Sequence, residues 1–172
     1  GFLTCSLFLH PDHEYLLLMV SSWRRGLLSS NFIEVASALS SISSLVSADH
    51  VLALQDLVMP LISHRQDLVR KKAIMVLHRF WQVRPSILPD IQAALKRALC
   101  DPHPSVMFAC LVFFSDLVEQ KPALYKDATP SFVSILKQIG EHALPSSYEY
   151  RRIPAPWMQI RLLSILSKLG KN

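Results

Sequence analysis

Apolar residues recur at intervals of three and four along the whole chain, which is the spacing of one buried face of an α-helix. Turn-forming residues divide this pattern into segments of helical length. The pattern predicts an all-α chain with helices at about residues 2–9, 13–28, 32–46, 49–63, 67–83, 86–99, 104–120, 130–143 and 155–169.

The boundaries between these segments carry residues that favour helix starts and ends. Asp and Asn side chains accept hydrogen bonds from the free N–H groups of a first turn, and proline has the φ angle that a first turn needs. Starts are therefore predicted at Asp12, Asn31, Asp67, Pro85, Pro104, Pro130 and Pro156. Ends are predicted at Gly26, at Gly140 or Pro145, and at Gly170.

Four of the segments resemble one another. Each begins with a β-branched residue and continues with an apolar stripe: VASALSSISSL, VRKKAIMVLHRF, VMFACLVFFSDL and IRLLSILSKLG, starting at Val35, Val69, Val106 and Ile160. Four positions later stand Leu39, Ala73, Cys110 and Ser164, and the last three are small enough for a neighbouring helix to approach closely.

The four starts are separated by 34, 37 and 54 residues, so the first two intervals fit a helix-pair repeat. The stretch ALPSSYEYRRIPAP lengthens the third interval. One helix pair cannot bury its apolar face alone. We therefore expect a HEAT/armadillo-like α-α superhelix, or solenoid, of antiparallel helix pairs rather than a closed bundle.

Composition agrees with a helical, folded chain. Of 172 residues 51% are hydrophobic and only four are glycine, which disfavours a turn-rich β fold. The longest uninterrupted apolar runs, Tyr15 to Val20 and Val106 to Phe114, are shorter than the roughly 18 residues of a membrane span. The first ten residues also lack the basic start and cleavage site of a signal peptide.

The net charge and the cysteine content indicate which surfaces the chain would bind and which redox compartment it occupies. The formal net charge of +5 and the pI near 9.3 favour anionic surfaces, without naming one. Cys5, Cys100 and Cys110 form no CxxC pair, and their odd number favours reduced, buried thiols in a cytosolic protein.

Residues that support metal binding or catalysis are few. His10 with His13, and Cys100 with His103, have the spacing of a ligand pair, but each pair lacks the second pair that zinc needs. Turn or capping roles are therefore favoured. There is no P-loop, no GxGxxG and no nucleophile elbow. Asp116 and Glu119 share a helical face, which more often indicates a solvated edge than an acid/base pair. We predict no catalytic, metal or cofactor site and no cofactor.

Basic and aromatic side chains allow two interpretations each. The basic residues could align near the starts of successive helices and bind phosphates, although an ordinary solvated face is favoured. They are Arg24, Arg25, Arg65, Arg70, Lys71, Lys72, Lys96, Arg97, Arg151 and Arg152. Core packing is favoured over a binding pocket for the aromatic residues Trp23, Trp81, Trp157, Phe108, Phe113 and Phe114.

Three stretches resemble the large adaptin chains of heterotetrameric adaptor complexes, and the resemblance covers essentially the whole sequence. They are GFLTCSLFLHPDHEYLLLMVSS, LVRKKAIMVLHRF and IPAPWMQIRLLSILSKLGKN. RALCD, YKDATPSFVSILKQI and IPAPW are most similar to epsilon chains, with gamma and alpha chains next. SSWRRGLLSS departs from the family pattern, and Gly26 is expected to end its helix early.

The resemblance implies a non-enzymatic scaffold in vesicle-mediated transport. Such chains assemble with a second large chain, a medium chain and a small chain, and they join Golgi or trans-Golgi and coated-vesicle membranes from the cytoplasm with a small GTPase. Residues 1–172 would be a single trunk segment, truncated at both ends. No functional motif of the family falls on these residues. The alternative from another class is a basic HEAT-type module that binds nucleic acid or transport cargo; nucleic acid is the less favoured partner.

Overall fold

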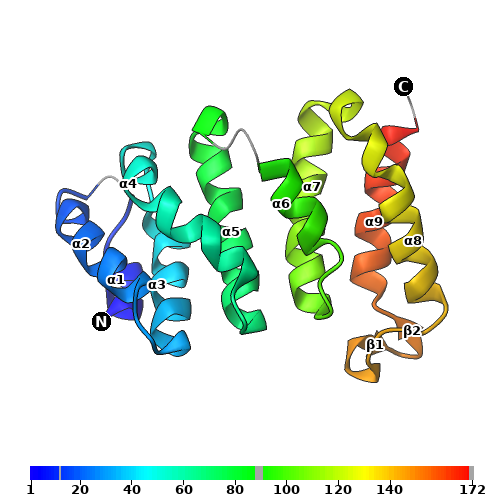
Figure 1. The fold of residues 1–172 in the computed structure, drawn as a ribbon, viewed down its shortest axis with the longest axis horizontal. Helices are drawn as coiled ribbons and strands as arrows, with labels where there is room; N and C mark the ends of the chain where they lie inside the picture. Colours follow the sequence, from blue (N-terminus) through cyan, green and yellow to red (C-terminus); the bar gives the residue numbers. More distant parts are fainter. Residues whose placement is uncertain (12, 88–90, 171–172) are drawn as a thin grey trace. The chain divides into compact units, whose positions relative to one another are not determined.

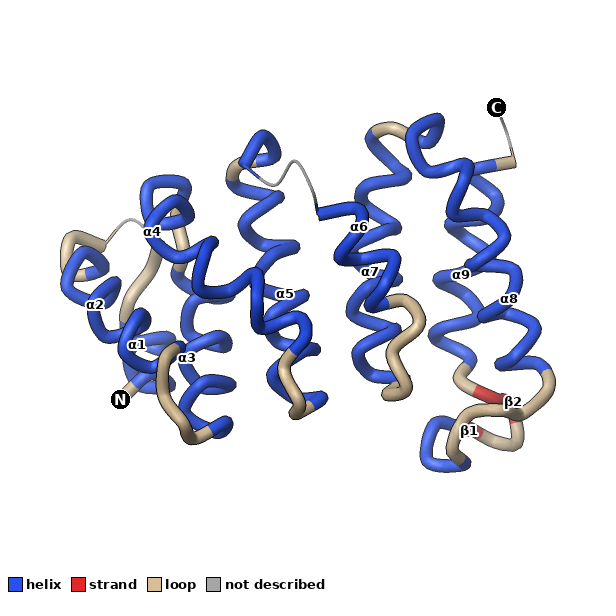
Figure 2. Tube along the Cα trace, viewed as in Figure 1, coloured by secondary structure: helices blue, strands red, loops and turns tan. Residues whose placement is uncertain are grey.

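The computed structural model describes residues 1–11, 13–87 and 91–170, which fall into two compact units, Gly1–Ala94 and Leu95–Asn172. Most of the described chain is helical, and the two strands are each two residues long (Figures 1 and 2). The prediction of an all-α chain is confirmed.

In the first unit, helix α3 lies at the centre. It packs against α1, α2 and α5, while α4 contacts both α2 and α5 (Figure 1). The elements are α1 (Phe2–Phe8), α2 (Leu16–Leu27), α3 (Phe32–Leu45), α4 (Ala48–Val58), the 3-10 helix η1 (Met59–Ser63), α5 (Asp67–Val83) and the 3-10 helix η2 (Pro85–Ile87).

Among the described residues of this unit, the buried polar side chains are Ser41 and His50, and the rest of the core is apolar. Trp23, Leu39 and Ile74 have no exposed surface. The Nε1–H of Trp23 donates to Oγ of Ser41 at 3.0 Å, and the imidazole of His50 stands edge-on to the indole. A buried indole N–H without a partner would cost about 1–3 kcal/mol, so this bond favours the observed packing of α2 against α3.

The second unit is built on α7 and α9, which pack along each other, with α8 against α9 (Figure 1). Rings of Phe114, Phe132 and Tyr125 meet edge to face in its core, with Phe114 centroid distances of 5.4 and 6.0 Å. Its elements are α7 (Pro104–Gln120), the 3-10 helix η3 (Pro122–Ala128), α8 (Thr129–Gly140), η4 (Ser146–Tyr148), β1 (Glu149–Tyr150), β2 (Ile153–Pro154) and α9 (Pro156–Leu169); α6 (Ile91–Ala98) includes the division between the units.

Most predicted helix boundaries are confirmed. The Asn31 side chain accepts from the N–H of Ile33, and Pro104, Pro130 and Pro156 lie in first turns. Gly140 is the last residue of α8, and Gly170 is the C-cap of α9.

Several boundary predictions need correction. Gln66 is the N-cap of α5, so Asp67 lies in the first turn, where its charge favours the helix dipole. Pro85 begins η2 instead of α6, and the segment at 49–63 divides into α4 and η1, where Pro60 cannot donate a helical hydrogen bond. The predicted cap Asp12 lies outside the described residues.

Gly26 does not end its helix early. Helix α2 continues to Leu27, and Gly26 is buried where α2 meets α1 and α3. A Cβ atom at this position would lie 2.9 Å from Cβ of Ala38 and 3.0 Å from Cζ of Phe2. The glycine therefore permits a close approach of three helices.

The buried face of α9 does not include Ile160, the β-branched residue that begins its aligned segment. Met158, Leu162 and Ile165 have no exposed surface, whereas Ile160 and Leu163 are 70% and 54% exposed. The repeat alignment is thus correct for Val35, Val69 and Val106, which are buried, and wrong for the helix that contains Ile160. Helix α9 carries apolar residues on two faces, and only one of them packs against α7 and α8.

Candidate functional site

The pairs that have the spacing of metal ligands, His10 with His13 and Cys100 with His103, lie in turns, and the histidines have structural contacts there. Nδ1 of His13 accepts from the N–H of Tyr15, and the His10 ring stands edge-on to His13. The N–H of His103 donates to Asp101 at 2.8 Å. Across the described ranges, no three His, Cys, Asp or Glu side chains are grouped as a metal ion would need.

The three cysteines occupy different environments, so the expectation that all are buried was wrong. Cys100 is exposed beside a groove of about 400 Å³, Cys5 is half-buried and Cys110 is buried. Burial, with the Asp101 carboxylate, raises the pKa of the Cys110 thiol far above its ordinary range. Cys110 therefore stays protonated and unreactive at neutral pH.

The candidate carboxylate pair lies at a solvated edge. Glu119 is exposed and forms an ion pair with Lys168, with an Nζ to Oε2 distance of 3.1 Å. Asp116 is half-buried. This ion pair joins α7 to α9, so Glu119 has a structural role at the surface.

The basic residues do not gather at successive helix starts. Arg24 and Arg25 lie in the last turn of α2, and Lys96 and Arg97 in the last turn of α6, where positive charge complements the helix dipole. Arg24 donates to the carbonyl of Ala53, and Lys96 pairs with Asp127. One cluster does lie at a helix start: Arg65, Arg70, Lys71 and Lys72 surround the start of α5.

Within that cluster, positive charges lie close enough to affect one another. Partial burial and the neighbouring Lys71 lower the pKa of Lys72. Arg70 donates to the carbonyls of His64 and Arg65, which ties the start of α5 to the preceding loop. The hydrogen bonds of Arg70 give this part of the cluster a structural role at the start of α5.

The aromatic residues are mostly in the core, as expected. Trp23, Phe113 and Phe114 have no exposed surface, Trp81 is buried and Phe108 is half-buried. Trp157 is the exception, since 39% of its surface is exposed.

Large apolar side chains are exposed on particular helix faces in each unit. We define the α9 outer face as Trp157, Ile160 and Leu163, which follow one another at a spacing of three residues. In the first unit, Leu3 and Leu7 of α1 and Leu17 of α2 are between 72% and 75% exposed. Contiguous exposed side chains of this size are typical of surfaces that another polypeptide covers.

A β-hairpin precedes α9, and the sequence did not predict it. Tyr150 pairs with Ile153 across a two-residue turn formed by Arg151 and Arg152. Both arginines have positive φ angles, 51° and 66°, in the left-handed region that is unfavourable for residues with a Cβ.

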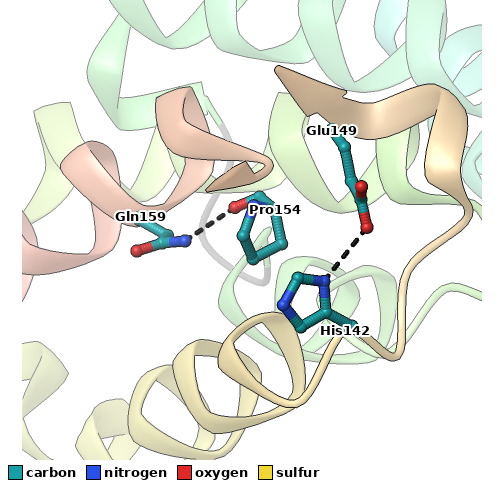
Figure 3. Close-up of polar contacts among 4 residues, drawn as sticks. All are labelled: His142, Glu149, Pro154 and Gln159. Atoms are coloured by element: carbon teal, nitrogen blue, oxygen red, sulfur yellow. Dashed lines mark hydrogen bonds and ion pairs between the residues drawn. The ribbon is translucent and has the colours of Figure 1, made fainter. Parts of the chain in front are cut away.

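Side-chain contacts fix the base of this hairpin (Figure 3). Nδ1 of His142 lies 3.0 Å from a carboxylate oxygen of Glu149, and the side-chain amide of Gln159 donates to the carbonyl of Pro154. The N–H of Ala155 donates to the carbonyl of Tyr148 at 2.9 Å. The hairpin is thereby held between the end of α8 and the start of α9.

Comparison with known proteins identifies the family. The model of the adaptin N terminal region matches residues 1–172. The chain belongs to the adaptin N-terminal family. This adaptin chain is 42% identical to the AP-4 complex subunit epsilon of Arabidopsis thaliana and 39% identical to AP-4 complex subunit epsilon-1 of Homo sapiens.

Both alignments cover all of this adaptin chain, but only 18% and 15% of the two relatives. The AP-2 complex subunit alpha of Schizosaccharomyces pombe is 28% identical over 96% of the chain and 19% of its own length. The resemblance to adaptins, strongest for epsilon chains and weaker for alpha chains, is therefore confirmed.

A homology model of the full-length AP-3 complex in an intermediate open conformation has the same fold. It aligns with a TM-score of 0.75 and 22% identity over 99% of the adaptin chain and 28% of its own. The predicted HEAT/armadillo-like solenoid class is thus confirmed. In the described part of this adaptin, none of the helices has both the length and the apolar composition of a membrane span.

Proposed function

We propose that this chain is a non-enzymatic scaffold segment of an adaptor-complex large subunit, acting in vesicle-mediated protein transport and cargo sorting. The observation that carries the proposal is its 38–42% identity, over its full length, to epsilon subunits of AP-4 complexes from plant, mouse and human. Adaptor subunits of this family are structural coat proteins, and catalysis is no part of the proposed role.

The packing supports a scaffold role. Each unit has a close-packed apolar core, which resists deformation. Each unit also exposes large apolar side chains, such as Leu7 in α1 and Ile160 in α9, at helix faces. We propose that residues 1–172 are one trunk segment of a longer large subunit, and that neighbouring helices of that subunit cover these faces, because stacked helix pairs bury their faces against each other.

The partners follow from the same proposal. The large subunit would assemble with a second large, a medium and a small subunit. The complex would associate peripherally with trans-Golgi and endosomal membranes from the cytoplasm, recruited there by a small GTPase. The names of the relatives, which are subunits of AP-4, AP-3 and AP-2 complexes, support assembly with other subunits.

Affinity purification of the full-length protein from its own cells tests this function. We expect a second large, a medium and a small adaptor subunit to co-purify in equal amounts. A full-length protein that purifies without any of them would contradict the proposal. The control is an unrelated helical-repeat protein of similar size, purified in the same way.

A further inference from the structure

The hairpin between α8 and α9 is the most unusual feature of the described surface. Arg151 and Arg152 at its tip, with Tyr150 and Ile153 beside them, have high exposure: 56% for Tyr150 and 51% for Ile153. Tyrosine and arginine, together with tryptophan, are enriched at the energetic centres of protein interfaces. We propose that this hairpin tip, residues 150–153, binds a concave, carboxylate-bearing surface of another folded protein.

The backbone of the segment is strained, and the strain is concentrated there. Among described non-glycine residues, positive φ angles occur only at His142, Arg151, Arg152 and Ala155. Each left-handed residue carries a conformational cost, and folded structures keep such residues where the arrangement is useful. An Asn-Gly turn would form the same hairpin without this cost. The arginines therefore have a role that turn formation does not explain.

Contacts at the tip and at the base stabilise the hairpin. The guanidinium carbon of Arg151 lies 5.4 Å from the centroid of the Tyr150 ring, a cation–π contact that favours this arrangement of the two side chains. The contacts of Glu149 with His142 and of Gln159 with Pro154 fix the hairpin base (Figure 3). A surface that is already ordered loses less entropy on binding.

Charge indicates the chemistry of the partner. Within the described chain, no carboxylate lies within ion-pair distance of Arg151 or Arg152, and the nearby Glu149 is paired with His142. A guanidinium group forms two parallel hydrogen bonds with a carboxylate, a geometry that rewards a fixed orientation. Tyr150 and Ile153 add apolar surface, so the fitting site is acidic with an apolar part.

An anionic membrane is the competing partner, and magnitudes favour a protein. Two basic residues increase partitioning onto an anionic bilayer roughly 30-fold, which is far less than a single myristoyl chain provides. Binding to mobile lipid headgroups also does not depend on how a guanidinium group is oriented. The strain and the base contacts are better explained by a partner of defined shape.

Photo-crosslinking in cells tests the proposal directly. Tyr150 of the full-length protein is replaced by the photoreactive benzoylphenylalanine, and adducts are mapped by mass spectrometry. We expect an adduct with a protein segment that contains Asp or Glu. The same group placed at Tyr15, which is also 56% exposed, is the matched control and should not give this adduct.

Two double variants separate charge from conformation. R151E/R152E should reduce the adduct by about ten-fold or more, because it places like charges together. R151N/R152G should do the same while the hairpin is retained, as judged by slow amide exchange at Ala155. R25E/R65E changes the net charge equally at exposed arginines of the other unit and should leave the adduct unchanged.

Four results would overturn the proposal. A lipid adduct at position 150 would assign the hairpin to a membrane. A protein adduct that persists in R151N/R152G, or that maps to a segment without carboxylates, would show that the arginines do not select the partner. Absence of any adduct above the Tyr15 control would show that the hairpin tip has no partner. None of these results bears on co-purification of adaptor subunits, so the proposed function is tested separately.

Discussion

At the scale of single residues, close packing decides the conformation more than local preference does. Glycine lowers helix stability by about 1 kcal/mol relative to alanine, so a glycine near a helix end is reasonably predicted to stop the helix. Gly26 instead lies inside the last turn of α2, where its missing side chain admits Phe2 and Ala38. The helix continues past Gly26 because of contacts with residues distant in the sequence, and a local sequence pattern cannot reveal such contacts.

Gly26→Ala should destabilise the packing of α1 and α2 on α3. The new Cβ would come within 2.9 Å of Cβ of Ala38, and such overpacking costs about 1–3 kcal/mol, more than the helix propensity that alanine restores. Hydrogen–deuterium exchange of the full-length protein should show faster exchange in α2 and α3. Gly140→Ala is the control, since nothing lies within 4 Å of that Cβ position, and it should slow exchange in α8 or leave it unchanged. Equal behaviour of the two variants would contradict this explanation.

Cys110 should make the stability of its unit depend on alkaline pH. Its pKa is raised by burial in the folded chain from an ordinary 9.0, so above about pH 9 the unfolded chain loses a proton that the folded chain keeps. Below that pH the contribution of Cys110 to the free energy of unfolding is constant. Above it, the free energy of unfolding falls by about 1.4 kcal/mol per pH unit. Urea denaturation at about pH 8 and about pH 10 should show a larger loss for the wild type than for Cys110→Ala. An equal loss in both proteins would show that this thiol is not responsible.

At the scale of elements, the helices were predictable and the hairpin was not. Stripes at spacings of three and four define α3, α5 and α7 because each buries one continuous face. The hairpin has strands of two residues and a turn of two arginines in place of asparagine and glycine, so none of the usual hairpin signals is present. In α9 both Ile160 and Leu162 belong to apolar stripes, and the sequence offers no means of choosing the inner one.

R151N/R152G should stabilise the hairpin. Asparagine and glycine adopt positive φ at little cost, whereas each left-handed arginine costs about 1–2 kcal/mol. The amide of Ala155, which donates to Tyr148, should then exchange more slowly in the full-length protein. Arg151→Val with Arg152→Val provides the opposite case and should speed exchange there. Unchanged exchange in both variants would mean that the turn carries no strain.

At the scale of the whole molecule, the family was predictable because its motifs extend along the chain. IPAPW and VRKKA lie near the starts of α9 and α5, and their combination is more specific than either motif alone. The candidate sites were less predictable. Exposure of Trp157 and Ile160 depends on which helix faces find partners, and this is a property of the assembled fold.

The α9 outer face should matter for assembly and little for folding of its unit. Ile160→Lys with Leu163→Lys changes residues that are 70% and 54% exposed, so far-ultraviolet circular dichroism of the full-length protein should be unchanged. Tryptic cleavage after α9 should increase, because the helices that would cover this face no longer fit. Leu162→Ala is the contrasting variant: it empties a fully buried position and should cost about 2–5 kcal/mol. Wild-type resistance to trypsin in the double lysine variant would show that the face is open in the full protein.

The contact at Gly26 also bears on how related chains can vary. A side chain fits here without strain only if the groups that face it shift or become smaller, since Cβ of Ala38 and Cζ of Phe2 would lie 2.9 and 3.0 Å from the new Cβ. Relatives with alanine or a larger residue at this position should therefore carry a smaller residue than phenylalanine at position 2, or glycine at position 38. We therefore expect the three positions to vary together, although positions 26 and 38 lie 24 and 36 residues after position 2.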